Sequence, residues 1–134
     1  MDKEQTMTVT AMQLANLTTG RLITEIGDVY TLLEVLVDAP LMRHMLPMAN
    51  RHSRPYLQKK FPELCVPELI ERIYFAGEMC QIGGLSQQWL QNEFRQIFKH
   101  FHGPYVIERG GARFTDKDAA EAFVKPLEQI GANR

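Results

Sequence analysis

The amino-acid sequence predicts an α+β domain that is mostly α, with about six short helices around one core and a small antiparallel hairpin or sheet. Apolar residues recur at helical spacing in two stretches, residues 29–37 and residues 90–101. Proline and glycine residues divide the rest of the chain into short segments, and one of these, Tyr105–Arg109, has the composition of a strand. A chain of 134 residues can bury a core of its own, so residues 1–134 are expected to form a single globular domain, with residues 1–6 disordered and residues 132–134 as a tail.

The first elements are predicted from caps and from apolar spacing. A short helix over residues 11–15 follows a threonine that can cap it. Residues 21–26 predict either a short strand or an extended lead-in, because polar and apolar side chains alternate there only in part. Asp28 is then expected to cap a helix over residues 29–37. That helix ends before Pro40, since the residue preceding a proline is driven out of the helical region.

Prolines also set the limits of the next two predicted helices. Pro40 is expected to open a short helix over about residues 41–46, and Pro47 limits it to about two turns. The following segment, residues 48–60, predicts one helix that starts near Pro55 or is kinked there.

The second half predicts a pair of longer helices and a strand. Pro67 opens a helix that Gly83 and Gly84 stop, and its buried side is expected to hold Ile70, Ile73, Tyr74 and Gly77. Ser86 caps the next helix, whose apolar stripe is the strongest in the chain and consists of Leu90, Phe94, Ile97, Phe98 and Phe101.

The predicted strand over residues 105–109 lies between Pro104 and the pair Gly110-Gly111. A short returning strand is expected at Arg113-Phe114, and Thr115 is expected to cap a last helix.

Composition excludes several classes of protein. A net charge of −1 provides no overall field for steering the chain to nucleic acid or to an anionic membrane. The two cysteines lack CxxC spacing, no signal peptide is visible, and no apolar stretch approaches membrane-spanning length. We therefore expect a cytoplasmic protein without membrane contact. No cofactor motif is present, and no metal is expected, since His100 and His102 would face apart on a helix and lack a third ligand nearby.

The clearest charge feature is the segment from Leu41 to Pro62, which carries five Lys or Arg residues and no acidic residue. It predicts a basic face for phosphates or for an acidic patch on a protein. The alternative is a solvated helix face that pairs with the acidic residues Glu25, Asp28, Glu34 and Asp38. The predicted binding surface consists of Arg43, His44, Arg51, Arg54, Lys59 and Lys60, together with Arg109 and Arg113 on either side of the two glycines.

Two further features allow two interpretations each. The turn at Gly110-Gly111 could be the tip of a DNA-reading wing or a plain hairpin turn. Trp89 and Tyr105 could anchor a partner or belong to the core.

Several short motifs of the N-terminal half occur together: Thr19-Gly20-Arg21-Leu22, Asp28-Val29-Tyr30, Pro40-Leu41, His44, Leu46-Pro47 and Phe61-Pro62-Glu63-Leu64. As a set, over about residues 10–64, they resemble a family of small uncharacterised phage and prophage proteins that open with a similar Thr-Gly-Arg-Leu element. The resemblance implies a virus-encoded accessory protein that acts inside a bacterium, and it brings no catalytic residues. Small phage proteins of this kind often bind and block a host machine, so the resemblance implies inhibition of a host defence protein.

The leading hypothesis from the sequence is a non-enzymatic protein-binding module that engages a bacterial or phage protein. The second hypothesis is a small nucleic-acid-binding regulator that uses the basic residues of segment 41–62. The third is a small enzyme, for which Glu78, His44 and His100 are available but not arranged in any motif. Homodimerisation is an alternative that the sequence leaves open, although no heptad pattern requires it.

Overall fold

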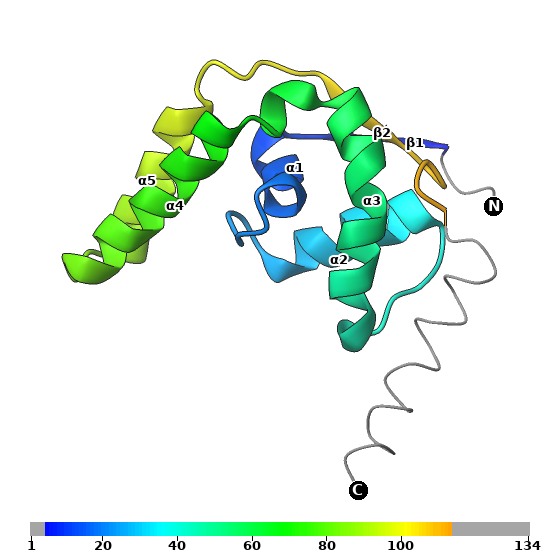
Figure 1. Cartoon of the computed structure of the whole chain (residues 1–134), viewed down its shortest axis with the longest axis horizontal. Coiled ribbons are helices and arrows are strands. Elements are labelled where there is room, and N and C mark those ends of the chain that lie inside the picture. Colours follow the sequence, from blue (N-terminus) through cyan, green and yellow to red (C-terminus); the bar gives the residue numbers. More distant parts are fainter. Residues whose placement is uncertain (1–4, 114–134) are drawn as a thin grey trace, which may run out of the picture.

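The computed structural model describes residues 5–113 of the chain. Helices α1 (Ala11–Thr18), α2 (Ile26–Val37) and α3 (Leu46–Lys60) form the body. Helices α4 (Pro67–Ile82) and α5 (Gln87–Phe98) form a hairpin that extends to one side of that body (Figure 1). The predicted mostly helical α+β fold is confirmed. The helix predicted from Thr115 onward lies outside the described residues, and no described helix has the length and apolar character needed to cross a membrane.

The small sheet joins the two ends of the described chain. Strand β1 (Thr6–Val9) pairs antiparallel with β2 (Tyr105–Glu108), so that Thr6 lies opposite Glu108 and Val9 lies opposite Tyr105. The strand predicted after Pro104 is therefore confirmed, but its partner is not the returning strand. Arg113 follows a turn and belongs to no strand, and Phe114 lies outside the described residues. Thr6, predicted as part of a disordered segment, instead begins β1.

Helix α1 is held at its start by a reciprocal cap. The Thr10 hydroxyl accepts from the Gln13 amide, and the Gln13 side chain accepts from the Thr10 amide. Farther along, the buried side chain of Asn16 accepts hydrogen bonds from the amides of Ile23 and Thr24. Residues 21–25 thus form a bent connection held by Asn16, and neither the predicted strand nor a continuous extended lead-in is found there.

Helix α2 begins earlier than the sequence predicts. Its first residue is Ile26, and Glu25 occupies the cap position without a side-chain cap bond. Asp28 lies inside the first turn, where it accepts from the Thr24 hydroxyl at 2.6 Å, so the prediction that Asp28 caps this helix is wrong. The helix ends at Val37, as predicted from Pro40.

The helix predicted over residues 41–46 does not form. Residues 40–42 are extended, and a short 3-10 helix, η1 (Arg43–Met45), leads directly into α3. Pro47 lies in the first turn of α3, where the missing amide of a proline costs no helical hydrogen bond, so Pro47 does not end a helix. Pro55 is accommodated inside α3, which extends to Lys60 as predicted.

A second 3-10 helix, η2 (Pro62–Leu64), connects α3 to α4. The predicted ends of α4 at Pro67 and Gly83 are confirmed, and Ser86 caps α5 through a hydrogen bond from the Trp89 amide. Helix α5 ends at Phe98, so Phe101 lies beyond it and packs on the Phe98 ring with the ring centroids 5.4 Å apart.

The buried side of α4 differs in part from the prediction. Ile73 and Gly77 are buried as expected, but Ile70 is half-buried and Tyr74 is exposed. The residues that complete the buried side are Leu69, Ala76 and Cys80. Tyr74 instead reaches back toward α1, where its hydroxyl donates to the Thr19 carbonyl at 3.1 Å.

The core combines residues from all five helices with Ile107 of β2. Phe94 is completely buried, whereas Phe75 on the neighbouring helix is 63% exposed. The Phe94→Ala variant should therefore lose about 3–5 kcal/mol of unfolding free energy, because it opens a cavity. The matched Phe75→Ala variant should lose under about 1 kcal/mol. Urea unfolding followed by circular dichroism measures both, and equal losses would contradict the core described here.

Candidate interaction surfaces

The outer face of α3 carries the centre of the predicted basic surface. Arg51, Arg54 and Lys59 are exposed, while the inner face of the helix buries Ala49, Ser53 and Leu57. The helical period separates these two sets, since residues three and four apart share a face. Arg43 and His44 are also exposed, but they lie in η1, before the start of the helix.

The basic residues on this outer face do not pair with the acidic residues of the N-terminal half. Asp38 binds arginines of the turn after β2, Asp28 accepts from Thr24, and Glu34 accepts from the backbone amide of Leu41 at 3.1 Å. Within residues 5–113, no ion pair is formed by Arg43, Arg51, Arg54 or Lys59. The alternative of a solvated helix face is thus correct about solvent exposure, but the pairing with Glu25, Asp28, Glu34 and Asp38 that it predicts is not found among the described residues.

The turn after β2, residues 109–113, is bonded to the end of α2. The last carbonyls of a helix have no partner within the helix, and here those of Val35 and Leu36 accept from the amides of Gly110 and Ala112, both at 2.8 Å. Asp38 has a left-handed backbone with φ of 54°. Its carboxylate pairs with the Arg113 guanidinium at 2.9 Å and the Arg109 guanidinium at 3.5 Å. This turn is thus fixed to the body, unlike the free tip of a wing.

A polar cluster joins α3 to β2. Lys60 forms an ion pair with Glu108 at 2.6 Å, and both side chains bond to the Tyr56 hydroxyl, which also accepts from the backbone amide of Glu108 at 3.1 Å. The Tyr56 ring fits against Gly111, where a Cβ atom would lie 2.6 Å from the ring. An open pocket of about 370 Å³ is lined by Tyr56, Lys60, Glu108 and Lys59.

Charge and hydrogen bonding shift the titration of this cluster. The hydrogen bond from Lys60 lowers the pKa of Glu108 below its ordinary value. Burial opposes the charged form of Lys60, but hydrogen bonds to Glu108 and Tyr56 outweigh it, so the pKa of Lys60 lies above its ordinary value. The ion pair therefore holds both groups in their charged forms.

The structure brings the two predicted basic regions together at this cluster. His52 of α3 hydrogen-bonds the Arg113 carbonyl at 3.1 Å, so the turn 109–113 lies beside α3. Three of the eight predicted surface residues, however, already bind acidic side chains within the chain: Lys60, Arg109 and Arg113. The basic face is accordingly defined from here on as Arg51, Arg54 and Lys59.

Candidate catalytic and metal-binding residues are dispersed. His44 lies in η1, Glu78 in α4, and His100 beyond the end of α5, and no hydrogen bond or ion pair joins them in the described chain. Residues 5–113 contain no group of three His, Cys, Asp or Glu side chains that could hold a metal. Cys80 is buried, and burial raises the pKa of the Cys65 thiol, which disfavours the nucleophilic thiolate.

The Thr19-Gly20-Arg21-Leu22 element connects α1 to α4. Tyr74 of α4 bonds the Thr19 carbonyl, and the Arg21 guanidinium lies 5.7 Å from the centre of the Tyr74 ring. Gly77 permits this approach, because a Cβ atom there would overlap the Arg21 side chain. The contacts of this element are thus contacts within the fold.

Sequence reasoning missed the exposed apolar side chains of the α4–α5 hairpin. Phe75, Met79 and Ile82 follow one another at spacings of four and three residues along α4, and they are 63%, 42% and 82% exposed. This spacing is that of a second helical stripe, next to the buried stripe of Leu69, Ile73, Ala76 and Cys80. Two adjacent stripes on one helix were the signal in the sequence that could have indicated this surface. Trp89 of α5, half-buried, packs against the core beside them.

Comparison with known families finds a match to part of the chain. A family model described as "Domain of unknown function (DUF7736)" matches residues 12–66, less than half of the chain. The matched region runs from α1 through η2 and includes α3 with its basic face, while both strands and the α4–α5 hairpin lie outside it. Comparisons with curated proteins and with solved structures found no match.

The Lys60–Glu108 ion pair predicts how the titration of Glu108 should change when Lys60 is replaced. Replacing Lys60 with Met should raise the pKa of the Glu108 carboxyl toward its ordinary value, because the donor that stabilises the carboxylate is lost. In the native protein, the contribution of Glu108 to stability is present above its unfolded-state pKa and is lost as the pH falls through its lowered folded-state pKa. Carboxyl carbon NMR shifts measured across the acid range report the change. Lys59→Met is the matched control, and an equal shift in both variants would contradict the pairing.

Proposed function

We propose that this chain is a non-enzymatic protein-binding module whose basic face on α3 docks against an acidic patch of a partner protein. One observation carries the proposal: Arg51, Arg54 and Lys59 are exposed and form no ion pair with a described residue. The acids Asp38 and Glu108 are bound by the basic residues outside this face, Arg109, Arg113 and Lys60. Unpaired arginines on a rigid helix are suited to bidentate contacts with carboxylates.

A protein partner is favoured over nucleic acid by the aromatic residues near this face. Binding to single strands usually adds base stacking on exposed rings. Tyr56 is held by Glu108 and Lys60, and Phe61 is buried, so neither ring is presented to a base. The net charge of −1 likewise supplies no overall attraction to phosphates.

The biological setting belongs to the same proposal. The resemblance of residues 10–64 to small phage and prophage proteins favours a phage-encoded accessory protein that works in the cytoplasm of a bacterial host. Such a module would act by binding a bacterial protein, and a host defence protein is the class of target that we propose. Inhibition by binding needs no catalytic residues, in keeping with the dispersed positions of His44, Glu78 and His100.

Charge reversal on α3 tests the proposal. A variant with Arg51→Glu and Arg54→Glu should lose binding to its protein partner, because two attractive contacts become repulsive. The double variant Arg95→Glu and Lys99→Glu changes net charge by the same amount at exposed positions of and after α5, and it should retain the partner. Affinity purification from bacterial lysate with and without nuclease, quantified by mass spectrometry, compares the two variants with the native chain.

Each outcome of that experiment is interpretable. A nuclease-resistant protein that is lost with the α3 variant but kept by the control supports the proposal. Nucleic acid captured in its place, and released by salt, would establish the second hypothesis. Capture of the same protein by both variants would move the contact away from the basic face.

A further inference from the structure

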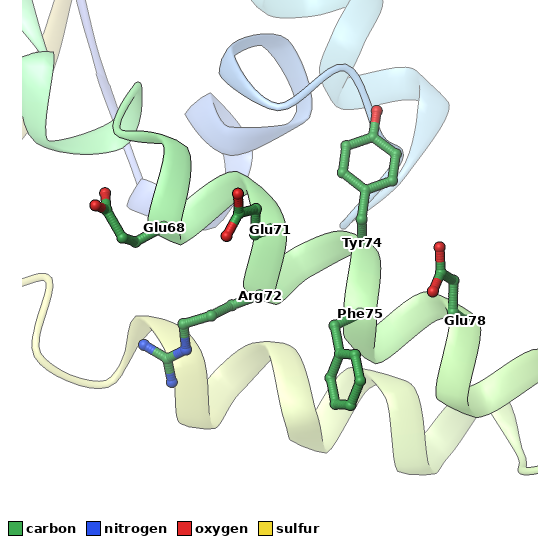
Figure 2. Close-up of a pocket in the computed structure, with 6 residues that line it drawn as sticks. All are labelled: Glu68, Glu71, Arg72, Tyr74, Phe75 and Glu78. Carbon is green, nitrogen blue, oxygen red and sulfur yellow. The ribbon is translucent and has the colours of Figure 1, made fainter.

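The seam between α4 and α5 forms an apolar groove on the side hairpin of the molecule. Its floor is Ala76 and Ile97, and its walls are Phe75, Met79 and Trp89. It has a volume of about 240 Å³. An open pocket of about 580 Å³ on α4 adjoins it and shares Arg72 and Phe75 with it. Figure 2 shows Phe75 and Arg72 leaning over α5 from α4, with Tyr74 pointing the opposite way toward α1.

The exposed apolar side chains of α4 form a stripe that extends beyond this groove and is arranged to receive a helix. Phe75 and Met79 line the groove, and Ile82 lies farther along α4. Phe75, Met79 and Ile82 span roughly 10 Å of α4 at the 1.5 Å rise of a helix. A helix that lies in such a groove presents its own anchors at the same spacing of four and three residues. Contiguous exposed apolar surface of this kind marks interaction sites in soluble proteins.

The surface of α4 around Phe75 is acidic. Glu68, Glu71 and Glu78 line the larger pocket and Glu93 lines the smaller one, whereas the basic residue that lines both is Arg72. None of these five side chains forms an ion pair with a residue of the described range 5–113. Carboxylates that flank the exposed apolar side chains of α4 favour a ligand that combines apolar anchors with positive charge.

We propose that the α4–α5 groove is a docking site for a cationic amphipathic helix of another protein. A second copy of this chain fits it poorly, because a symmetric contact would bring four carboxylates from each copy together against one arginine from each. The site is separate from the basic face of α3, since it lies on other helices and selects the opposite charge. The inference therefore does not depend on the proposed function.

Tryptophan fluorescence gives a direct test. Trp89 is the single tryptophan of the chain and lines the groove, so a ligand that enters should change its emission. The probe is a tryptophan-free leucine–lysine peptide with amphipathic helical spacing, and a leucine–glutamate peptide of the same pattern is its charge-reversed counterpart. The cationic peptide should bind, the acidic peptide should not, and salt should weaken the binding.

Matched variants locate the binding. Phe75→Ser and Met79→Ser should each reduce the affinity for the cationic peptide by roughly tenfold, because each removes an apolar wall of the groove. Met42→Ser is the control, since Met42 is an exposed methionine outside the α4–α5 hairpin and is 58% exposed. All three positions are on the surface, and thermal melts of the variants verify that the fold is retained.

Three results would overturn the proposal. The first is that the cationic peptide leaves Trp89 emission unchanged, and the second is that it binds the Phe75→Ser variant as tightly as the native chain. The third is a concentration-dependent dimer in analytical ultracentrifugation that Phe75→Ser abolishes, since it would assign the groove to a second copy. None of these measurements involves Arg51 or Arg54. A result that overturns the groove proposal therefore leaves the proposal for the basic face unaffected.

Discussion

The arrangement of this fold depends on how the C-terminal end of α2 is satisfied. A helix leaves its last carbonyls without partners, and a negative charge at that end is unfavourable next to the helix dipole. Here both problems are solved by one turn, residues 109–113, whose amides bond the carbonyls of Val35 and Leu36 and whose arginines neutralise Asp38. The same turn fixes the end of β2, and β2 in turn holds β1 and places Glu108 against Lys60 of α3. Removing these contacts would free the sheet from α2 and weaken its contact with Tyr56 and Lys60 of α3.

A net charge near zero conceals two surfaces of opposite character. Helix α3 presents two arginines and a lysine that form no ion pair with a described residue, whereas the α4–α5 hairpin carries four carboxylates and one arginine beside its exposed apolar side chains. The overall charge of −1 is therefore a sum of separated patches and says little about what either patch attracts. Since the two surfaces lie on different helices of one chain, the two proposed partners would be held at a set distance from each other.

The sequence was a good guide wherever the determinant is local. Pro40 ends α2, Gly83 ends α4 and Ser86 starts α5 because caps and proline geometry act within a few residues. The sequence predicts the structure poorly where a contact between residues far apart in the chain determines the conformation. Thr6 becomes a strand residue through pairing with Glu108, and Tyr74 leaves the core because the Thr19 carbonyl is within reach. For the candidate surfaces, the acid-free composition of α3 could be read directly. The partners of Arg109, Arg113 and Lys60 could not be predicted, since Asp38 and Glu108 are distant from them in sequence.

The pairing of β1 with β2 has a consequence for how the chain reaches this structure. The strands stand at the two ends of the described sequence, so each rung of the ladder closes a loop that contains nearly all of it. Contacts of such long range cost chain entropy before they return any stabilisation, and they slow folding relative to the local turns of the helices. During synthesis, α1, α2 and α3 emerge from the ribosome before β2 exists, and the end of α2 lacks its bonding partners until Ala112 has emerged. Completion of the fold is thereby tied to completion of the C-terminal part of the domain, and a nascent chain that stops at α4 would carry β1 as an unpaired edge.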